Sequence, residues 1–127
     1  MTPFDAAFAG YSVDDIDAAR TFYRDTLGLA VEQNAMGILD IALPGGGHII
    51  LYPKPDHQPA VFTVLNLVVA DIDAAVAELN AAGVVTKIYD DPDYGTDERG
   101  IARGNGGPDI AWFRDPSGNV LSVLVDR

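Results

Sequence analysis

The 127-residue chain has no cysteine, two histidines, one tryptophan and only eight lysines and arginines. Without cysteine it can form no disulfide, no thiolate metal site and no cysteine nucleophile, which fits a reducing compartment such as the cytoplasm. Nineteen acidic side chains give a formal net charge of −11. Because nucleic-acid partners and anionic membranes attract clusters of basic side chains, we expect neither as a partner.

Long hydrophobic runs are also missing. No apolar stretch approaches the roughly 18 residues that cross a bilayer, and the N-terminal MTPFDAAF lacks the basic and apolar regions of a signal peptide. Since 48% of the residues are hydrophobic, the chain can still bury a core. We therefore expect one domain, residues 1–127, in the cytoplasm. Its negative charge would favour a cationic small molecule, although acidic surfaces more often only confer solubility.

The sequence contains an internal repeat. VDDIDAAR at 13–20 returns as VADIDAAV at 69–76. In each copy an apolar, strand-like stretch leads to an aspartate, a helical pattern and then short strands joined by Gly/Pro turns. The duplication predicts two βαβββ modules, at about residues 5–54 and 61–127.

The elements of each module follow from periodicity and from cap residues. The first module is expected to contain a strand at 8–13, a helix from the Asp15 cap to about Asp25 that ends at Gly28, and strands at 29–34, 37–42 and 48–52. The second is expected to contain a strand at 63–68, a helix from the Asp71 cap to Gly83, and strands at 84–89, 110–114 and 120–125. DPSGN at 115–119 predicts a hairpin turn, and 90–108 a long loop.

Three segments together resemble a known family. They are DIDAARTFYRDTLGL (15–29), ADIDAAVAELNAAGV (70–84) and AWFRDPSGNVLSVLV (111–125), and their order and separations are similar to those of the vicinal-oxygen-chelate superfamily. That superfamily contains glyoxalase I, extradiol dioxygenases and bleomycin-resistance proteins. The resemblance implies an α+β fold in which two βαβββ modules form a U-shaped mixed sheet with a concave cleft. It also implies a homodimer.

The resemblance further implies where a metal would bind. Enzymes of this superfamily hold it on His and Glu side chains from the first and last strands of each module. The matching positions here are Phe8, Ile50, Val64 and Ser122. Three of them have no lone pair to donate, and a neutral serine hydroxyl is a poor ligand. We therefore predict a site without a metal and without a cofactor.

The period of two along strands predicts which side chains line the cleft. The expected set is Phe8, Gly10 and Ser12; His48, Ile50 and Tyr52; Val64, Asn66 and Val68; and Val120, Ser122 and Leu124. An apolar and aromatic lining with a few polar groups is typical of a small-molecule pocket. Trp112 could stack on a planar ligand or pack in the core. Tyr94 and Arg99, in the long loop, are expected to help close the pocket.

Catalytic candidates are few. His48 and Tyr52 share a predicted face, and imidazole titrates near neutral pH, so both are weak acid-base candidates. His57, in a proline-rich linker, is expected at the surface. Ser122 has no evident histidine and acid partners, so a nucleophilic triad is not supported. The glycine clusters at 45–47 and 104–107 indicate turns rather than a nucleotide-binding loop.

Three functional hypotheses follow. The first is metal-independent binding of a small organic ligand, cationic or aromatic, similar to that of bleomycin-resistance proteins. The alternative is a small lyase, isomerase or dioxygenase-like enzyme that uses His48 and Tyr52 or a displaced metal site. The third is a dimeric regulatory or interaction module. The sequence leaves open the ligand, and whether the modules pack within one chain or swap between two.

Overall fold

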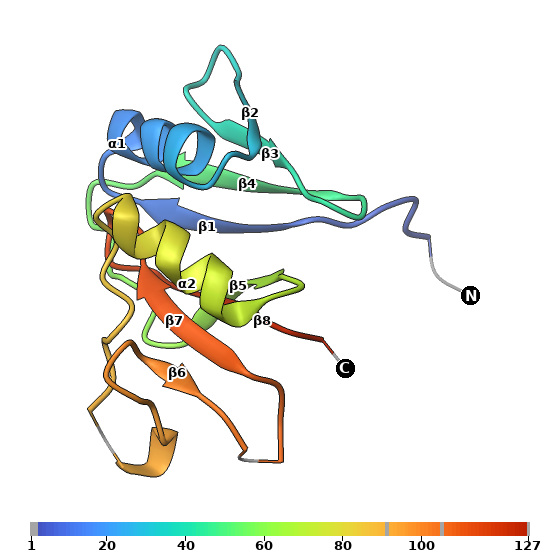
Figure 1. The fold of residues 1–127 in the computed structure, drawn as a ribbon. Coiled ribbons are helices and arrows are strands. Elements are labelled where there is room, and N and C mark those ends of the chain that lie inside the picture. The colour runs from blue at the N-terminus through green and yellow to red at the C-terminus, as the bar shows by residue number, and fades with distance from the viewer. Residues whose placement is uncertain (1–2, 91, 105, 127) are drawn as a thin grey trace. The chain divides into compact units, whose positions relative to one another are not determined.

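The computed structural model describes residues 3–90, 92–104 and 106–126. The chain divides into two compact units, Met1–Pro59 and Ala60–Arg127. Each contains one four-stranded mixed sheet and one α-helix (Figure 1). The predicted α+β class is confirmed. In the described part of the chain, every helix is too short or too polar to cross a membrane.

The first unit follows the predicted order of elements. It contains β1 (Ala9–Val13), α1 (Ile16–Thr21), the π-helical turn η1 (Phe22–Thr26), β2 (Ala30–Gln33), β3 (Leu39–Ala42) and β4 (His48–Pro53). The strand order is β1-β4-β3-β2, with β1 parallel to β4 and the other pairs antiparallel.

The helix of the first unit covers one face of its sheet, and the sequence explains where it begins and ends. The Asp15 carboxylate accepts a hydrogen bond from the backbone N–H of Ala18 at 3.0 Å, so the predicted cap is confirmed. After η1, Gly28 has a φ of +71°, a conformation that glycine adopts without steric cost. The buried side chains of this unit are Val13, Ala19, Tyr23, Leu39, Ile41, Ile49 and Leu51.

The second unit repeats this topology. It contains β5 (Thr63–Val68), α2 (Ile72–Ala81), the 3₁₀ turn η2 (Pro92–Tyr94), β6 (Ile101–Ala102), β7 (Ile110–Arg114) and β8 (Val120–Leu124). The strand order is β5-β8-β7-β6, with β5 parallel to β8. The predicted Asp71 cap is confirmed by its bond to Ala74 N–H at 3.1 Å. The duplication in sequence is therefore a duplication in structure.

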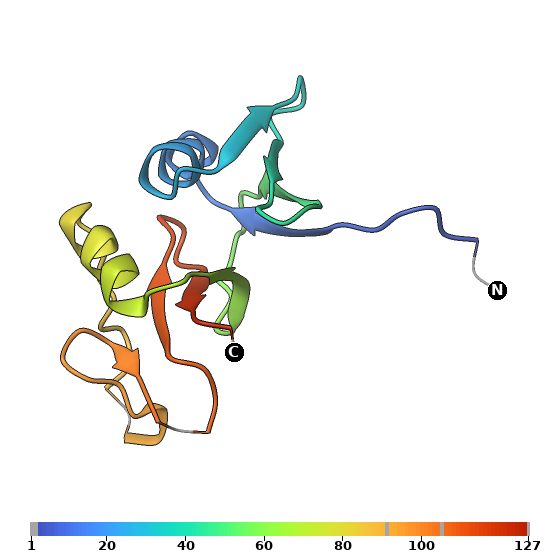
Figure 2. The same ribbon diagram turned by 45° about the vertical axis from the view of Figure 1, so that its right-hand side comes forward.

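One face of the second sheet is buried against α2 (Figure 2). The helix contributes Ile72, Val76 and Leu79, and the sheet contributes Leu65, Ile101, Ala111, Phe113, Leu121 and Val123, all of them buried. We call the opposite face of this sheet the open face. Because side chains alternate along a strand, residues between these positions point to the open face.

The predicted strand at 84–89 is wrong. This segment forms no ladder, and the two-residue strand β6, inside the expected long loop, takes the edge position instead. Thr86 is buried, accepts a hydrogen bond from the Asn80 side chain at 3.0 Å and donates one to the Arg99 carbonyl at 2.7 Å. These bonds to distant residues replace the strand pairing that the local apolar pattern predicts.

The predicted turn at 115–119 is confirmed and is unusually well bonded. The Asp115 carboxylate accepts from the backbone N–H groups of Ser117 and Asn119, both at 2.9 Å, and from the Asn119 amide at 3.1 Å. Asn119 in turn accepts from Ala60 N–H at 3.1 Å. Since these polar side chains are buried, the bonds offset the cost of burial and fix the β7–β8 hairpin.

Gly100 and Gly83 form a matched pair for testing the packing of the 84–89 segment. Their φ values are +86° and +87°, so alanine meets the same backbone strain at either site, about 1–2 kcal/mol. A Cβ at Gly100 would lie 1.8 Å from the Thr86 carbonyl oxygen, whereas at Gly83 it meets nothing within 4 Å. Gly100→Ala should therefore lower the free energy of unfolding by a further ~1–3 kcal/mol relative to Gly83→Ala, measured by urea denaturation. Equal losses would contradict this packing.

Candidate functional site

The open face of the second unit carries an aromatic cluster. Tyr89 and Tyr94 stack with ring centroids 4.1 Å apart, and both stand edge-on to Trp112, at 5.3 and 5.6 Å. Trp112 lies on the open face because its neighbours Ala111 and Phe113 are buried against α2. The long loop thus brings Tyr94 to Trp112. Tyr94 remains 40% exposed.

Tyr89 is a site residue that the sequence reasoning missed, because its segment was assigned to a strand. Burial raises the pKa of Tyr89, the neighbouring Tyr94 adds to this, and the Arg114 guanidinium opposes it. Its phenol therefore stays protonated at neutral pH and can donate a hydrogen bond.

Beside the cluster, two polar side chains from neighbouring strands are paired. The Ser122 hydroxyl donates a hydrogen bond to the Asn66 side-chain oxygen at 2.6 Å, and Ser122 is 0% exposed. The register places Ser122 between Asn66 on β5 and Trp112 on β7. This bond holds the exposed Asn66 amide in one position, on the far side of Ser122 from the indole. Val68 and Leu124 form the next row of the open face, and half-buried Val64 lies at an irregularity in β5.

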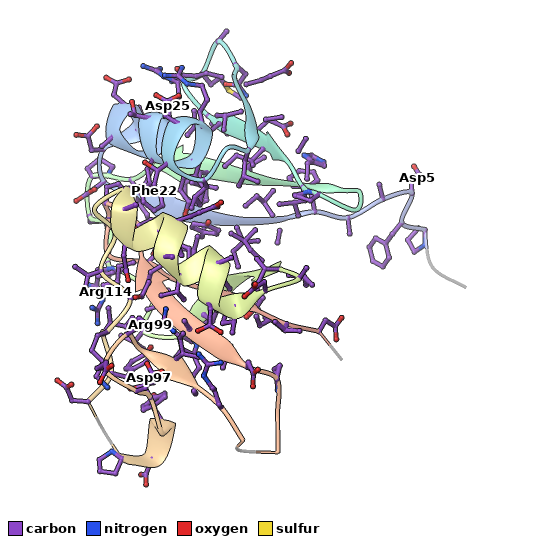
Figure 3. All side chains as sticks on the ribbon, in the orientation of Figure 1. Asp5, Phe22, Asp25, Asp97, Arg99 and Arg114 are labelled. Carbon is purple, nitrogen blue, oxygen red and sulfur yellow. The ribbon has the colours of Figure 1, made fainter. Side chains whose placement is uncertain are left out.

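Arg99 does not join this cluster. Its guanidinium forms an ion pair with Asp73 in the first turn of α2, on the helix side of the sheet, and Arg103 binds the same carboxylate at 2.6 Å. Figure 3 shows Arg99, before β6, and Arg114, at the end of β7. The role we expected for Arg99 in closing a pocket on the Trp112 side is therefore corrected, because its charge is engaged on the α2 side.

In the first unit, the predicted lining residues share the sheet face opposite α1. Gly10 and Ser12 on β1 are paired in register with Ile50 and Tyr52 on β4. The rings of Phe8 and His48 lie 4.6 Å apart. His48 Nδ1 also lies 3.1 Å from an Asp40 carboxylate oxygen. His48 is thus held between an aromatic ring and an acid.

His57 corrects a second expectation, that it would be a surface residue. It is half-buried, and its Nδ1 lies 2.6 Å from the Ser12 hydroxyl on β1. The linker after β4 turns back onto the sheet, since Lys54 N–H bonds to the Val13 carbonyl and His57 N–H to the Lys54 carbonyl, both at 3.0 Å. A proline-rich linker gives no periodic signal for such a contact, so sequence patterns could not place it.

The side chains at the family's metal positions do not fit a divalent metal ion. Phe8 and Ile50 in the first unit and Val64 in the second are apolar, and the Ser122 hydroxyl is already bonded to Asn66. Across residues 3–90, 92–104 and 106–126, no three His, Asp or Glu side chains are grouped closely enough to hold a metal.

The family model described as the glyoxalase/bleomycin resistance protein/dioxygenase superfamily matches residues 6–123. The chain belongs to this superfamily. No curated protein sequence matches it significantly.

Solved structures share its fold. The antibiotic-binding protein TnmS3 from Streptomyces sp. CB03234 is 24% identical, with a TM-score of 0.72 and full coverage of both chains. Lactoylglutathione lyase from Agrobacterium tumefaciens is 20% identical, with a TM-score of 0.67 over 98% of this chain and 96% of that one. The fosfomycin resistance protein FosX from Listeria monocytogenes is 11% identical, with a TM-score of 0.73 over 99% and 96%. At these identities the likeness concerns the fold alone.

The ion pairs of Asp73 make the stability of the second unit depend on pH. The hydrogen bonds from Arg103 and then Arg99 lower the Asp73 pKa to about 2, whereas an unfolded aspartate titrates near about 3.9. Because the folded pKa is the lower one, the stabilisation is present above pH ~4 and is lost as the pH falls toward 2. The difference in unfolding free energy between wild type and Asp73→Asn should follow this course in urea titrations.

Glu98→Gln provides the control for Asp73→Asn. Glu98 is exposed and lies next to Arg99, and it makes no ion pair within the part of the chain that the structure describes. Its neutralisation should leave the pH profile of stability as in wild type. A profile for Asp73→Asn that runs parallel to wild type down to pH 2 would contradict the assignment of the Asp73 ion pairs.

Proposed function

We propose that the protein binds a small, planar organic ligand without a metal ion, on the open face of its second unit. The observation that carries this proposal is the cluster of Trp112, Tyr89 and Tyr94, with the fixed Asn66 amide two strands away in the same sheet. An apolar, aromatic surface with a few placed polar groups suits a small organic molecule. Stacking contributes about 0.5–1.5 kcal/mol beyond the burial of area, and Asn66 would orient the ligand.

The comparisons support binding as a role for this fold. The Streptomyces protein is described as antibiotic-binding, so a protein of this architecture holds a small organic molecule. The apolar side chains at the metal positions of our chain favour binding over metal-dependent catalysis. A homodimer and a cytoplasmic location are part of the same proposal.

A Trp112→Leu substitution tests the stacking surface, with the neutral two-ring compound 2-naphthamide as the probe. Leucine keeps an apolar side chain but removes the aromatic face, so affinity should fall about tenfold, the equivalent of 1.4 kcal/mol. Saturation-transfer NMR of the ligand measures this. Phe4→Leu, at an exposed aromatic residue of the first unit, should bind as wild type does.

Wild-type protein labelled with ¹⁵N gives an independent readout. The chain has one tryptophan, so a single indole N–H resonance reports on the site. It should shift with added 2-naphthamide, together with the Asn66 amide, while the Asn34 amide in the β2–β3 turn stays in place. If neither the indole nor Asn66 responds to planar probes, the proposed site is wrong.

A second candidate function is favoured by the contact between His48 and Asp40. A carboxylate beside an imidazole can orient it for proton transfer, and Tyr52 lies on the same strand face. On this alternative the protein is a lyase or isomerase that works through His48 and Tyr52. Lactoylglutathione, named for the Agrobacterium neighbour, is a suitable substrate to test.

His48→Ala separates the two candidates. If the protein only binds ligands, wild type and His48→Ala should both leave lactoylglutathione unchanged. The two proteins should bind 2-naphthamide with affinities within about twofold of each other, since His48 is not one of the three clustered aromatic side chains. Thiol release is followed spectrophotometrically. Turnover by wild type that His48→Ala loses would instead establish the enzyme, with Tyr52→Phe reporting on the hydroxyl.

A further inference from the structure

Arg114 is a basic side chain on the open face of the second unit. It is the last residue of β7, two positions after Trp112, and the buried residue between them is Phe113. Alternation along the strand therefore places Arg114 and Trp112 on the same face. In register, Arg114 lies opposite Val120 and Trp112 opposite Ser122. Arg114 is exposed.

Arg114 differs from the other basic side chains because it forms no ion pair among the described residues. The remaining lysines and arginines among the described residues each form an ion pair with an aspartate: Arg20 with Asp17, Arg24 with Asp25, Lys54 with Asp56, Lys87 with Asp90, and Arg99 and Arg103 with Asp73. Within the same set of residues Arg114 forms no ion pair. The chain has 19 acidic side chains, so a basic side chain without an ion pair is unusual in it.

Arg114 also lies close to the aromatic cluster. Its positive charge opposes the rise in the pKa of Tyr89, and the Tyr89 ring is 5.3 Å from that of Trp112. The guanidinium, the phenol and the indole therefore border one patch of the open face. A guanidinium offers several N–H donors in a planar fork that matches a carboxylate.

We propose that the ligand of this site is a planar aromatic carboxylate, with its ring on Trp112 and its carboxylate on the Arg114 guanidinium. This inference rests on the proposed function and narrows the ligand class. It differs from the cationic ligand that the net charge alone would favour. Charges beyond about 8 Å are largely screened at physiological ionic strength, so the nearest cation decides which charge the site accepts.

Three probes that share one ring system test the sign of the ligand charge: 2-naphthoate, 2-naphthamide and 2-naphthylmethylammonium. Each is titrated into ¹⁵N-labelled protein at one fixed ionic strength, and the indole N–H shift of Trp112 gives the affinity. We expect 2-naphthoate to bind about tenfold more tightly than 2-naphthamide, as for a partly exposed charge-assisted pair. The ammonium compound should bind most weakly.

Variants at Arg114 assign the preference to this side chain. Arg114→Gln should bind 2-naphthoate and 2-naphthamide equally, at the affinity that wild type shows for the amide, and Arg114→Lys should keep part of the preference. Arg24→Gln removes the same charge from the first unit and should behave as wild type. Because Arg114 is exposed, the unfolding temperature of each variant should confirm that it folds.

The outcomes separate this inference from the proposed function. If the amide and the carboxylate bind wild type equally well at Trp112, or the ammonium compound binds best, the carboxylate assignment is wrong while planar-ligand binding stands. A carboxylate preference that persists in Arg114→Gln would also overturn it. If no probe shifts the Trp112 resonance, the proposed function and this inference fail together.

Discussion

The packing of one face of each sheet against its helix is the constraint on which the rest of the structure depends. In β7, Ala111 and Phe113 are fully buried against α2. Their burial determines that the alternate residues of the strand, Trp112 and Arg114, point to the opposite face. A shift by one residue would expose Phe113 and bury the Arg114 charge, at a cost of several kcal/mol. The positions of Trp112 and Arg114 on the open face are thus set by the core behind them.

Much of the fold could be predicted from sequence because its signals are local. Asp15 and Asp71 precede helical patterns and cap them through bonds to residues three positions ahead. The turn after β7 is specified by Asp115 and Asn119. The segment 84–89 was different, since its conformation depends on Thr86 contacting Arg99 and Gly100. No local pattern encodes such a contact.

The candidate site was predictable to a smaller extent. Alternation predicted Ser122 in the lining, Trp112 was considered as a stacking residue, and the length of the loop suggested that Tyr94 could reach the pocket. Tyr89 and His57 were missed because each comes from a segment without regular structure, which a repeating pattern cannot place. Arg99 was misplaced because the chain offers its guanidinium many carboxylates. Composition does not reveal that its partner is Asp73.

The duplicated architecture has a consequence for how this protein could acquire new ligands. Both halves keep an aspartate cap and a parallel strand pair, yet one pairs the rings of Phe8 and His48, and the other stacks Tyr89 and Tyr94. Every second strand residue can change without disturbing the helix-facing layer. The strand residues that face away from the helix can therefore be substituted separately in each half, over a scaffold that both halves share.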